Sequence, residues 1–210
     1  MDERLRGTMT DHTLATIFIV VCSTIVAALL WVIITSNRLT QLRNLLRESW
    51  SDIDIQLKRR HDLIPNLVEV VRGYAVHEET VLDRVVQARQ NAIVQTKSIA
   101  NQIASESQLV GALNGLFARV EAYPDLKASQ QYLALQQELI DTEDRIAAAR
   151  RFYNANVRDF NTIVESFPSS IVASMVNFAP IPSLQFDAIE ISTPISVNLG
   201  SLEPGSPAQN

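Results

Sequence analysis

The chain has 210 residues, of which 47% are hydrophobic, enough for one domain of usual size with appendages. Its formal net charge of -5 argues against a general nucleic-acid-binding protein, which needs a basic face to neutralise phosphates. Cys22 is the only cysteine, and this excludes both an intrachain disulfide and a cysteine-based metal site.

A short N-terminal tail, residues 1–12, precedes an uncharged and strongly apolar stretch over residues 13–36. A helix rises about 1.5 Å per residue, so this stretch can cross the roughly 30 Å hydrocarbon layer of a membrane. A cleaved signal peptide is the competing interpretation, but the stretch is longer than the roughly 7–15 apolar residues of such a signal. The sequence therefore predicts a single transmembrane helix, held in the lipid bilayer, with Trp31 as an aromatic anchor near one interface.

The arginines that flank this stretch give a small orientation bias. Arg4 and Arg6 precede it, whereas Arg38, Arg43 and Arg47 follow it closely. Basic residues near a membrane segment favour the cytoplasmic side. The bias predicts a short N-terminus outside and a C-terminal domain in the cytoplasm.

A long helical pattern follows, and residues 37–167 form the expected helical domain. Its first apolar seam is spaced alternately by four and three residues, typical of helices packed as in a coiled coil. The pattern keeps its phase across Pro65, which indicates one helix with a kink there, at a cost of about 3 kcal/mol. Because proline lacks an N–H group, the carbonyl of His61 is left for water or a side chain. The seam comprises Leu46, Trp50, Ile53, Leu57, Arg60, Ile64, Leu67, Val71 and Tyr74.

Three further helices are predicted after this one. The second covers residues 77–104, and the third opens at Ser105 and Gln108, which have the spacing of a capping box. A break at residues 123–125 precedes a fourth long helix that runs to about residue 166. Four long helices with short connections predict an all-α protein, with an antiparallel up-and-down four-helix bundle behind the membrane helix.

The end of the chain differs in composition from the helical domain. Six prolines follow Phe167, and no lysine or arginine follows Arg158. Residues 168–182 are expected to hold a short amphipathic helix and a proline-rich segment. Residues 183–210 are expected to be a mostly irregular or disordered tail.

Two charged residues occupy positions on the apolar seams. Arg60 on the first helix and Glu143 on the fourth fall at similar heights if these helices are antiparallel. Either each side chain reaches solvent at the edge of the core, or the two form a buried pair that fixes helix register. Arg59, His61 and Asp62 lie off the seam, where the bundle does not need them, and they form a candidate partner surface.

Known catalytic and metal-binding patterns find no match in the sequence. A di-iron bundle needs Glu-x-x-His, but Lys58 and Tyr74 stand three residues before His61 and His77. A zinc site, a phosphate-binding loop and a nucleophile triad are disfavoured by residue types and spacing. We therefore predict no catalytic, cofactor or metal residues, no small-molecule substrate, and a protein that is not an enzyme.

Three stretches of the sequence resemble the signature blocks of the LemA family, in order and at similar spacing. The resemblance implies a bacterial inner-membrane protein with a helical-bundle domain inside and a short N-terminus outside, and it implies no activity. The C-terminal tail departs from the family pattern. The stretches are "WSDIDIQLKRRHDLIPNLVEVVRGYAVHEE" (residues 50–79), "RRFYNANVRDFN" (150–161) and "SFPSSIVASMVNFAPIP" (166–182).

Two classes of function fit these features. The first is a membrane-tethered, non-enzymatic interaction or scaffold protein at the cytoplasmic face, which self-associates or binds a protein partner. The second is an envelope sensor or accessory subunit whose bundle lies outside the cytoplasm. The topology of the membrane helix distinguishes the two.

Overall fold

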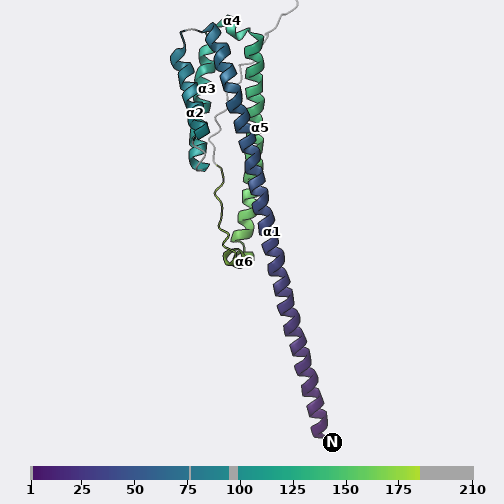
Figure 1. Ribbon diagram of the computed structural model, residues 1–210. Coiled ribbons are helices and arrows are strands. Elements are labelled where there is room, and N and C mark those ends of the chain that lie inside the picture. Colours follow the sequence, from purple (N-terminus) through teal and green to yellow (C-terminus); the bar gives the residue numbers. More distant parts are fainter. Residues whose placement is uncertain (1, 76, 95–98, 185–210) are drawn as a thin grey trace, which may run out of the picture. The chain divides into compact units, whose positions relative to one another are not determined.

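The computed structural model describes the backbone of residues 2–75, 77–94 and 99–184, and the side chains from residue 14 onward except 15. All regular structure in these ranges is helical, and no strand occurs there (Figure 1). The expected tail at residues 183–210 lies outside the described residues except for Ser183 and Leu184. The helices are α1 (Asp2–Tyr74), α2 (Glu79–Val94), α3 (Ile99–Val120), α4 (Pro124–Lys127), α5 (Gln130–Glu165) and α6 (Ser169–Met175).

The apolar stretch and the first helix of the domain form one helix, α1. Between Gly7 and Gly73 the sequence holds no glycine, and its only proline is Pro65, so nothing ends the helix earlier. Pro65 lies inside α1, as the continuous seam predicts. The expected N-terminal tail differs from the structure, because α1 begins at Asp2.

The predicted boundary between the second and third helices is wrong. α2 ends at Val94, and α3 already begins at Ile99. Ser105 is not a helix cap: its hydroxyl donates to the carbonyl of Gln102 inside α3, at 3.0 Å. Serine makes such bonds within helices as readily as at their ends, so the Ser-x-x-Gln pattern alone does not define a start.

The later helices begin and end close to their sequence signals. Pro124 opens the short helix α4, a favoured position because the first turn needs no N–H donor there. α5 then runs from Gln130, where a single long helix from residue 125 was expected. α6 ends in a Schellman-type turn: Asn177 has φ 58°, and the Phe178 N–H donates to the Ala173 carbonyl at 2.9 Å.

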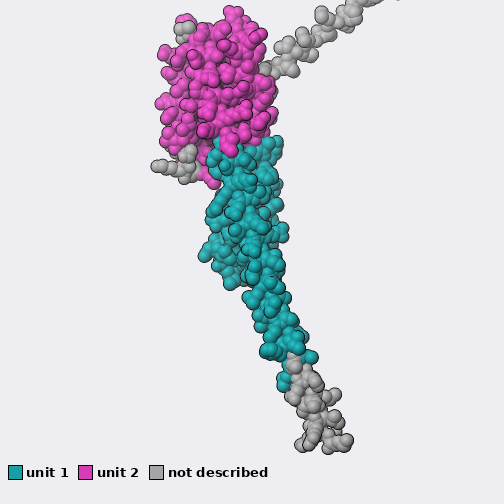
Figure 2. Space-filling model, turned by 45° about the vertical axis from the view of Figure 1, so that its right-hand side comes forward, with its two compact units in different colours: residues 1–54, 148–184 teal, residues 55–147, 185–210 magenta. Residues whose placement is uncertain are grey.

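The described chain divides into two compact units, which Figure 2 shows in different colours. The first, Met1–Asp54 with Ala148–Leu184, holds the N-terminal part of α1, the end of α5 and α6. The second, Ile55–Ala147, holds the rest of α1 and α5 with α2, α3 and α4. α1 and α5 therefore each contribute to two separate cores.

The second unit has one apolar core to which every one of its helices contributes. Its buried side chains keep the four-and-three spacing on α1 and α3, so each helix presents one continuous stripe. The core includes Ile64, Leu67 and Val71 of α1; Leu82, Val85 and Ala92 of α2; Leu109, Leu113 and Leu116 of α3; Leu126 of α4; and Tyr132 and Leu139 of α5.

The core of the first unit is narrower and includes a polar contact. The side chain of Asn156 on α5 donates to the hydroxyl of Ser49 on α1 at 2.6 Å, and both residues are buried. One turn away, the rings of Trp50 and Tyr153 meet edge to face with centroids 5.7 Å apart. The apolar members are Leu39, Leu46 and Ile53 of α1; Val157, Phe160 and Val164 of α5; Val172 and Ala173 of α6; and Leu184.

The segment after α6 is held along α5 through its backbone. The side-chain amide of Asn161 donates to the carbonyl of Ile181 at 2.7 Å and accepts from its N–H at 2.9 Å. Asn154, two turns earlier, makes the same two bonds to Leu184, at 2.9 and 2.8 Å. Each asparagine thus pairs with the backbone of one residue, as a neighbouring β-strand does.

The N-terminal part of α1 has an exposed apolar surface. Of the described residues, one helix, α1, is long and apolar enough to cross a membrane, and its most apolar 18-residue window has mean hydropathy 3.0. That window makes no buried contacts in the structure, and the side chains from Ile17 to Ile34 are mostly more than half exposed. Among the described side chains of this helix, Thr35 is the first that is buried.

Candidate functional site

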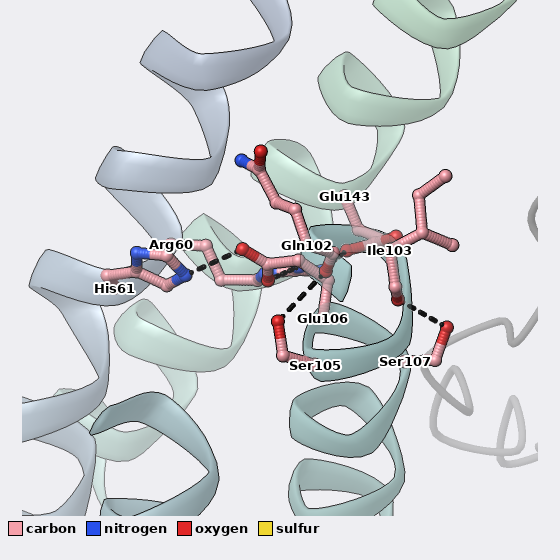
Figure 3. A network of polar contacts seen from close by, with 8 residues as sticks. All are labelled: Arg60, His61, Gln102, Ile103, Ser105, Glu106, Ser107 and Glu143. Carbon is pink, nitrogen blue, oxygen red and sulfur yellow. Dashed lines mark hydrogen bonds and ion pairs between the residues drawn. The ribbon is translucent and has the colours of Figure 1, made fainter. Parts of the chain in front are cut away.

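A buried cluster of charged side chains connects three helices of the second unit (Figure 3). At its centre is Arg60 of α1, which is 2% exposed. Its Nη1 lies 2.6 Å from Oε2 of Glu143 on α5, and its Nη2 lies 2.5 Å from Oε2 of Glu106 on α3. One guanidinium therefore links α1 to two neighbouring helices through two charge-assisted bonds.

Glu106 has a second partner on α1. Its other oxygen, Oε1, lies 3.0 Å from Nε2 of His61, the residue next to Arg60. Burial by itself would raise the pKa of the Glu106 carboxyl, but the hydrogen bond with His61 and the charge of Arg60 together hold that pKa below 4.5, its ordinary value. Glu106 is thus a buried carboxylate, stabilised in its ionised form by two adjacent residues of α1.

The backbone of His61 extends the cluster to a fourth helical segment. Pro65 has no N–H, so it cannot make the helical bond to the carbonyl of His61. The Nε of Arg89 on α2 donates to this carbonyl instead, at 2.6 Å. The carbonyl that lacks its helical bond therefore accepts a hydrogen bond from a side chain of another helix. Residues 60 and 61 together contact α2, α3 and α5.

The cluster is well suited to holding helices in register. The guanidinium terminal nitrogens and both oxygens of Glu106 are occupied by other members, and Arg60 and Glu106 are each 2% exposed. Arg60 Nε has no hydrogen-bond partner among the described residues, so the pairing is incomplete. Within the described part of the chain, no group of three or more His, Cys, Asp or Glu could hold a metal ion.

The structure places the residues singled out by sequence in two environments. It brings Arg60 and Glu143 together, with Glu143 17% exposed at the edge of the core. Arg59 and Asp62 are exposed. His61 differs from the expected surface position: it is 9% exposed, because α3 brings Glu106 over this side of α1 and covers residue 61 as well as residue 60.

Sequence reasoning missed Glu106 and Arg89. The seam of α3 through Leu109 and Leu113 continues upstream, at the same spacing, to Glu106 and Gln102, both of which are buried. Placing the start of this helix at Ser105 hid that continuation. No comparable signal marks Arg89, because its partner is a backbone carbonyl on another helix.

Removal of the central cation tests the cluster. Arg60→Met should lower the free energy of unfolding by about 3–5 kcal/mol, because it leaves Glu106 buried beside an uncharged side chain. Arg60→Met with Glu106→Leu should recover most of this loss. Urea unfolding of the detergent-solubilised chain, followed by circular dichroism, measures both. Arg59→Met, an exposed neighbour, is the matched control and should change stability by less than about 0.5 kcal/mol.

A double variant no more stable than Arg60→Met alone would contradict a coupled pair. Equal decreases in the free energy of unfolding for Arg59→Met and Arg60→Met would show that the buried position of Arg60 does not contribute to stability.

The lowered pKa of Glu106 predicts a specific loss of stability in acid. The unfolded chain takes up this proton at a higher pH than the folded chain, so the contribution of Glu106 is complete above pH 4.5 and is lost as the pH falls through its folded pKa. Glu106→Gln should therefore be less stable than the parent at neutral pH, and the difference should shrink in acid. Unfolding free energies measured across this range test it. Glu138→Gln, at an exposed position of α5, should leave the pH profile unchanged, and a parallel shift of the Glu106→Gln profile at all pH values would contradict the assignment.

The bond between Arg89 and the His61 carbonyl predicts a coupling between Arg89 and Pro65. Arg89→Met should cost about 1–3 kcal/mol, because a carbonyl inside the cluster loses its donor. In a Pro65→Ala background the new N–H can make the helical bond to His61, so the same change should cost much less. Pro65 is exposed, so alanine leaves no internal cavity and the fold should persist. A double-mutant cycle by urea unfolding measures the coupling, and equal costs in the two backgrounds would contradict it.

Comparisons with known proteins match most of the region that carries this geometry. The sequence profile of the LemA family matches residues 49–198, a range that includes the whole cluster. Protein LemA of Metamycoplasma hominis is 31% identical over 157 residues, which cover 73% of this chain and 70% of that protein.

Two magnetosome proteins are more distant relatives. Magnetosome protein MamQ of Magnetospirillum gryphiswaldense is 25% identical, and Magnetosome protein MamQ 2 of Paramagnetospirillum magneticum is 24% identical, each over 153 residues. These matches cover 61% of this chain but only 56% of either relative, so the chain spans little more than half of the MamQ proteins. With its profile matched over most of the chain and a relative at 31% identity, the chain belongs to the LemA family.

Proposed function

We propose that this protein is a membrane-tethered, non-enzymatic scaffold, which presents a rigid helical domain to protein partners at the cytoplasmic face of the inner membrane. The observation that carries the proposal is that α1 alone bears both the exposed apolar segment and Arg60. A helix embedded in lipid at one end thus supplies the central cation of the domain core.

The helical domain is an antiparallel up-and-down bundle. Four long segments, from α1, α2, α3 and α5, share the core of the second unit, and short connections support an alternating direction. The cluster around Arg60 supports the same arrangement, because it joins one level of α1 to α3, α5 and, through Arg89, α2. Such a domain offers long helix faces, which suit binding to another protein or to a second copy.

The partner surface includes the exposed residues next to the cluster. Arg59 and Asp62 lie beside Arg60 on α1, but they point to solvent and take no part in the core. Exposed charges on a rigid helix contribute to the rate and specificity of association more than to the stability of the domain. The cytoplasmic orientation is supported by Arg38, Arg43 and Arg47, which follow the apolar segment.

Removal of the apolar segment tests the tether. The full chain should remain in the membrane fraction after a carbonate wash, because its apolar surface is lipid-embedded. A chain lacking residues 1–36 should be soluble and should keep a helical circular dichroism spectrum with a cooperative melt, because Leu39 and the later core residues remain. A full chain extracted by carbonate would contradict the tether, and an unfolded truncated chain would contradict an independent domain.

Orientation and partner binding are tested in the same cells. A phosphatase reporter fused after Asn210 should be inactive, since it needs export, and in-membrane crosslinking should capture a protein with the parent but less with Arg59→Ala/Asp62→Ala. An active reporter would overturn the cytoplasmic scaffold and favour the envelope sensor or accessory subunit. Equal capture by both chains would remove Arg59 and Asp62 from the partner surface.

A further inference from the structure

The short helix α6 leaves an apolar face uncovered in the first unit. Ile171 and Met175 are 54% and 72% exposed, and their spacing by four places them on one side of α6. Phe167, in the turn just before the helix, is 82% exposed. Val172 and Ala173, on another side, are each 1% exposed and belong to the core. α6 is thus apolar both where it packs on the protein and where it faces outward, and the outward face is left uncovered by the part of the chain that the structure describes.

α6 is held firmly in its position. The hydroxyl of Ser169 donates to the carbonyls of Ile163 and Ser166, at 2.7 and 2.9 Å, at the start of the helix. The turn at Asn177 sends the chain back, and the ring of Phe178 meets that of Phe160 with centroids 5.9 Å apart. The exposed face is therefore presented by an ordered helix with fixed contacts at both ends.

These contacts place α6 close to the end of the apolar segment of α1. The Phe178 ring lies under the guanidinium of Arg43, 5.3 Å from its centroid, and α6 lies beside α1 in Figure 1. Arg43 is eight residues beyond Thr35, the first buried side chain among those described in α1, which is about 12 Å along a helix. The uncovered face of α6 therefore lies near the level at which the apolar surface of α1 ends.

The surface around α6 has an unusual charge distribution, because it lacks charged side chains but lies close to exposed arginines of α1. From residue 166 to residue 184 the sequence has no charged side chain, whereas Arg38 and Arg47 of α1 are exposed at this end of the unit. Helices that lie in the headgroup region of anionic membranes combine apolar side chains with basic ones. Here α6 supplies the apolar side chains and the adjacent α1 supplies the arginines. A protein partner would need no such continuity with the apolar segment.

We propose that α6 is a second membrane contact, in which Phe167, Ile171 and Met175 enter the lipid headgroup region beside the point where α1 leaves the bilayer. The proposal rests on the membrane tether proposed above. With two contacts on lipid, the first unit is held at a fixed angle to the membrane surface rather than on a freely tilting helix.

Fluorescence quenching in vesicles of phosphatidylethanolamine and phosphatidylglycerol tests this contact in the full chain. Three single-cysteine proteins carry the same environment-sensitive label: the parent at Cys22, Cys22→Ala/Met175→Cys, and Cys22→Ala/Phe152→Cys. Phe152 is the matched control, since it is an exposed apolar residue of the same unit, on α5 three turns before Ile163, which Ser169 of α6 contacts. Lipids with a nitroxide at the headgroup or deep in the acyl chain act as quenchers.

The label at 175 should lose fluorescence with the headgroup quencher, the label at Cys22 with the deep quencher, and the label at 152 with neither. Loss at Cys22 with none at 175 would overturn the α6 contact and leave the tether intact. No loss at Cys22 would overturn the tether itself. In the unlabelled Cys22→Ala/Met175→Cys protein, disulfide-linked dimers that still form when the protein is diluted with excess lipid before oxidation, together with no quenching of the labelled protein, would identify a second copy as the occupant and also overturn the proposal. Ile171→Cys repeats the measurement should the change at 175 disturb the fold.

Discussion

The two bonds of the Arg60 guanidinium are the interaction on which the second unit depends. Apolar stripes attract helices to one another but specify their sliding position weakly, because leucine against leucine is similar one turn along. A guanidinium between two carboxylates has no such tolerance: moving α3 or α5 by one turn would leave Glu106 or Glu143 without its partner. Desolvating these charges costs free energy, and the gain is specificity, because only one register of the helices pairs all three charged groups.

Pro65 takes part in the same arrangement from within the backbone. A proline in a helix is usually regarded as a defect to be tolerated, since it removes a bond and bends the axis. In α1 the removed bond exposes the carbonyl of His61 to the side chain of Arg89, so α2 is attached at the level of the charged cluster. His61 then serves twice, with its carbonyl toward α2 and its ring toward Glu106 on α3. One helical turn of α1 thus positions three other segments.

Features with a local or periodic signal could be predicted from the sequence, and features that depend on distant contacts could not. The four-and-three spacing correctly identified most buried positions of α1, although Tyr74 at the end of the predicted seam is 49% exposed, and the unbroken phase placed Pro65 inside a helix. The pattern at Ser105 misled because a hydroxyl bonds to a helix carbonyl in mid-helix as well as at a cap. The burial of His61 follows from the position of α3, which the spacing of residues within α1 does not indicate. Asn154 and Asn161 bond to residues 30 and 20 positions away in the sequence, and such contacts produce no periodic sequence pattern.

The two asparagines of α5 have a consequence for how the end of the chain can vary. They bind the N–H and the carbonyl of Ile181 and Leu184, groups that all residues except proline possess, so the pairing is indifferent to the side chains that it holds. It does exclude proline from positions 181 and 184, whose N–H groups are bound. Pro180 and Pro182 stand on either side of Ile181, where the asparagines bind no N–H and where a fixed φ favours an extended chain. The side chains of this stretch can thus vary widely without loss of the pairing. The pairing itself excludes proline only at positions 181 and 184, whose N–H groups α5 binds.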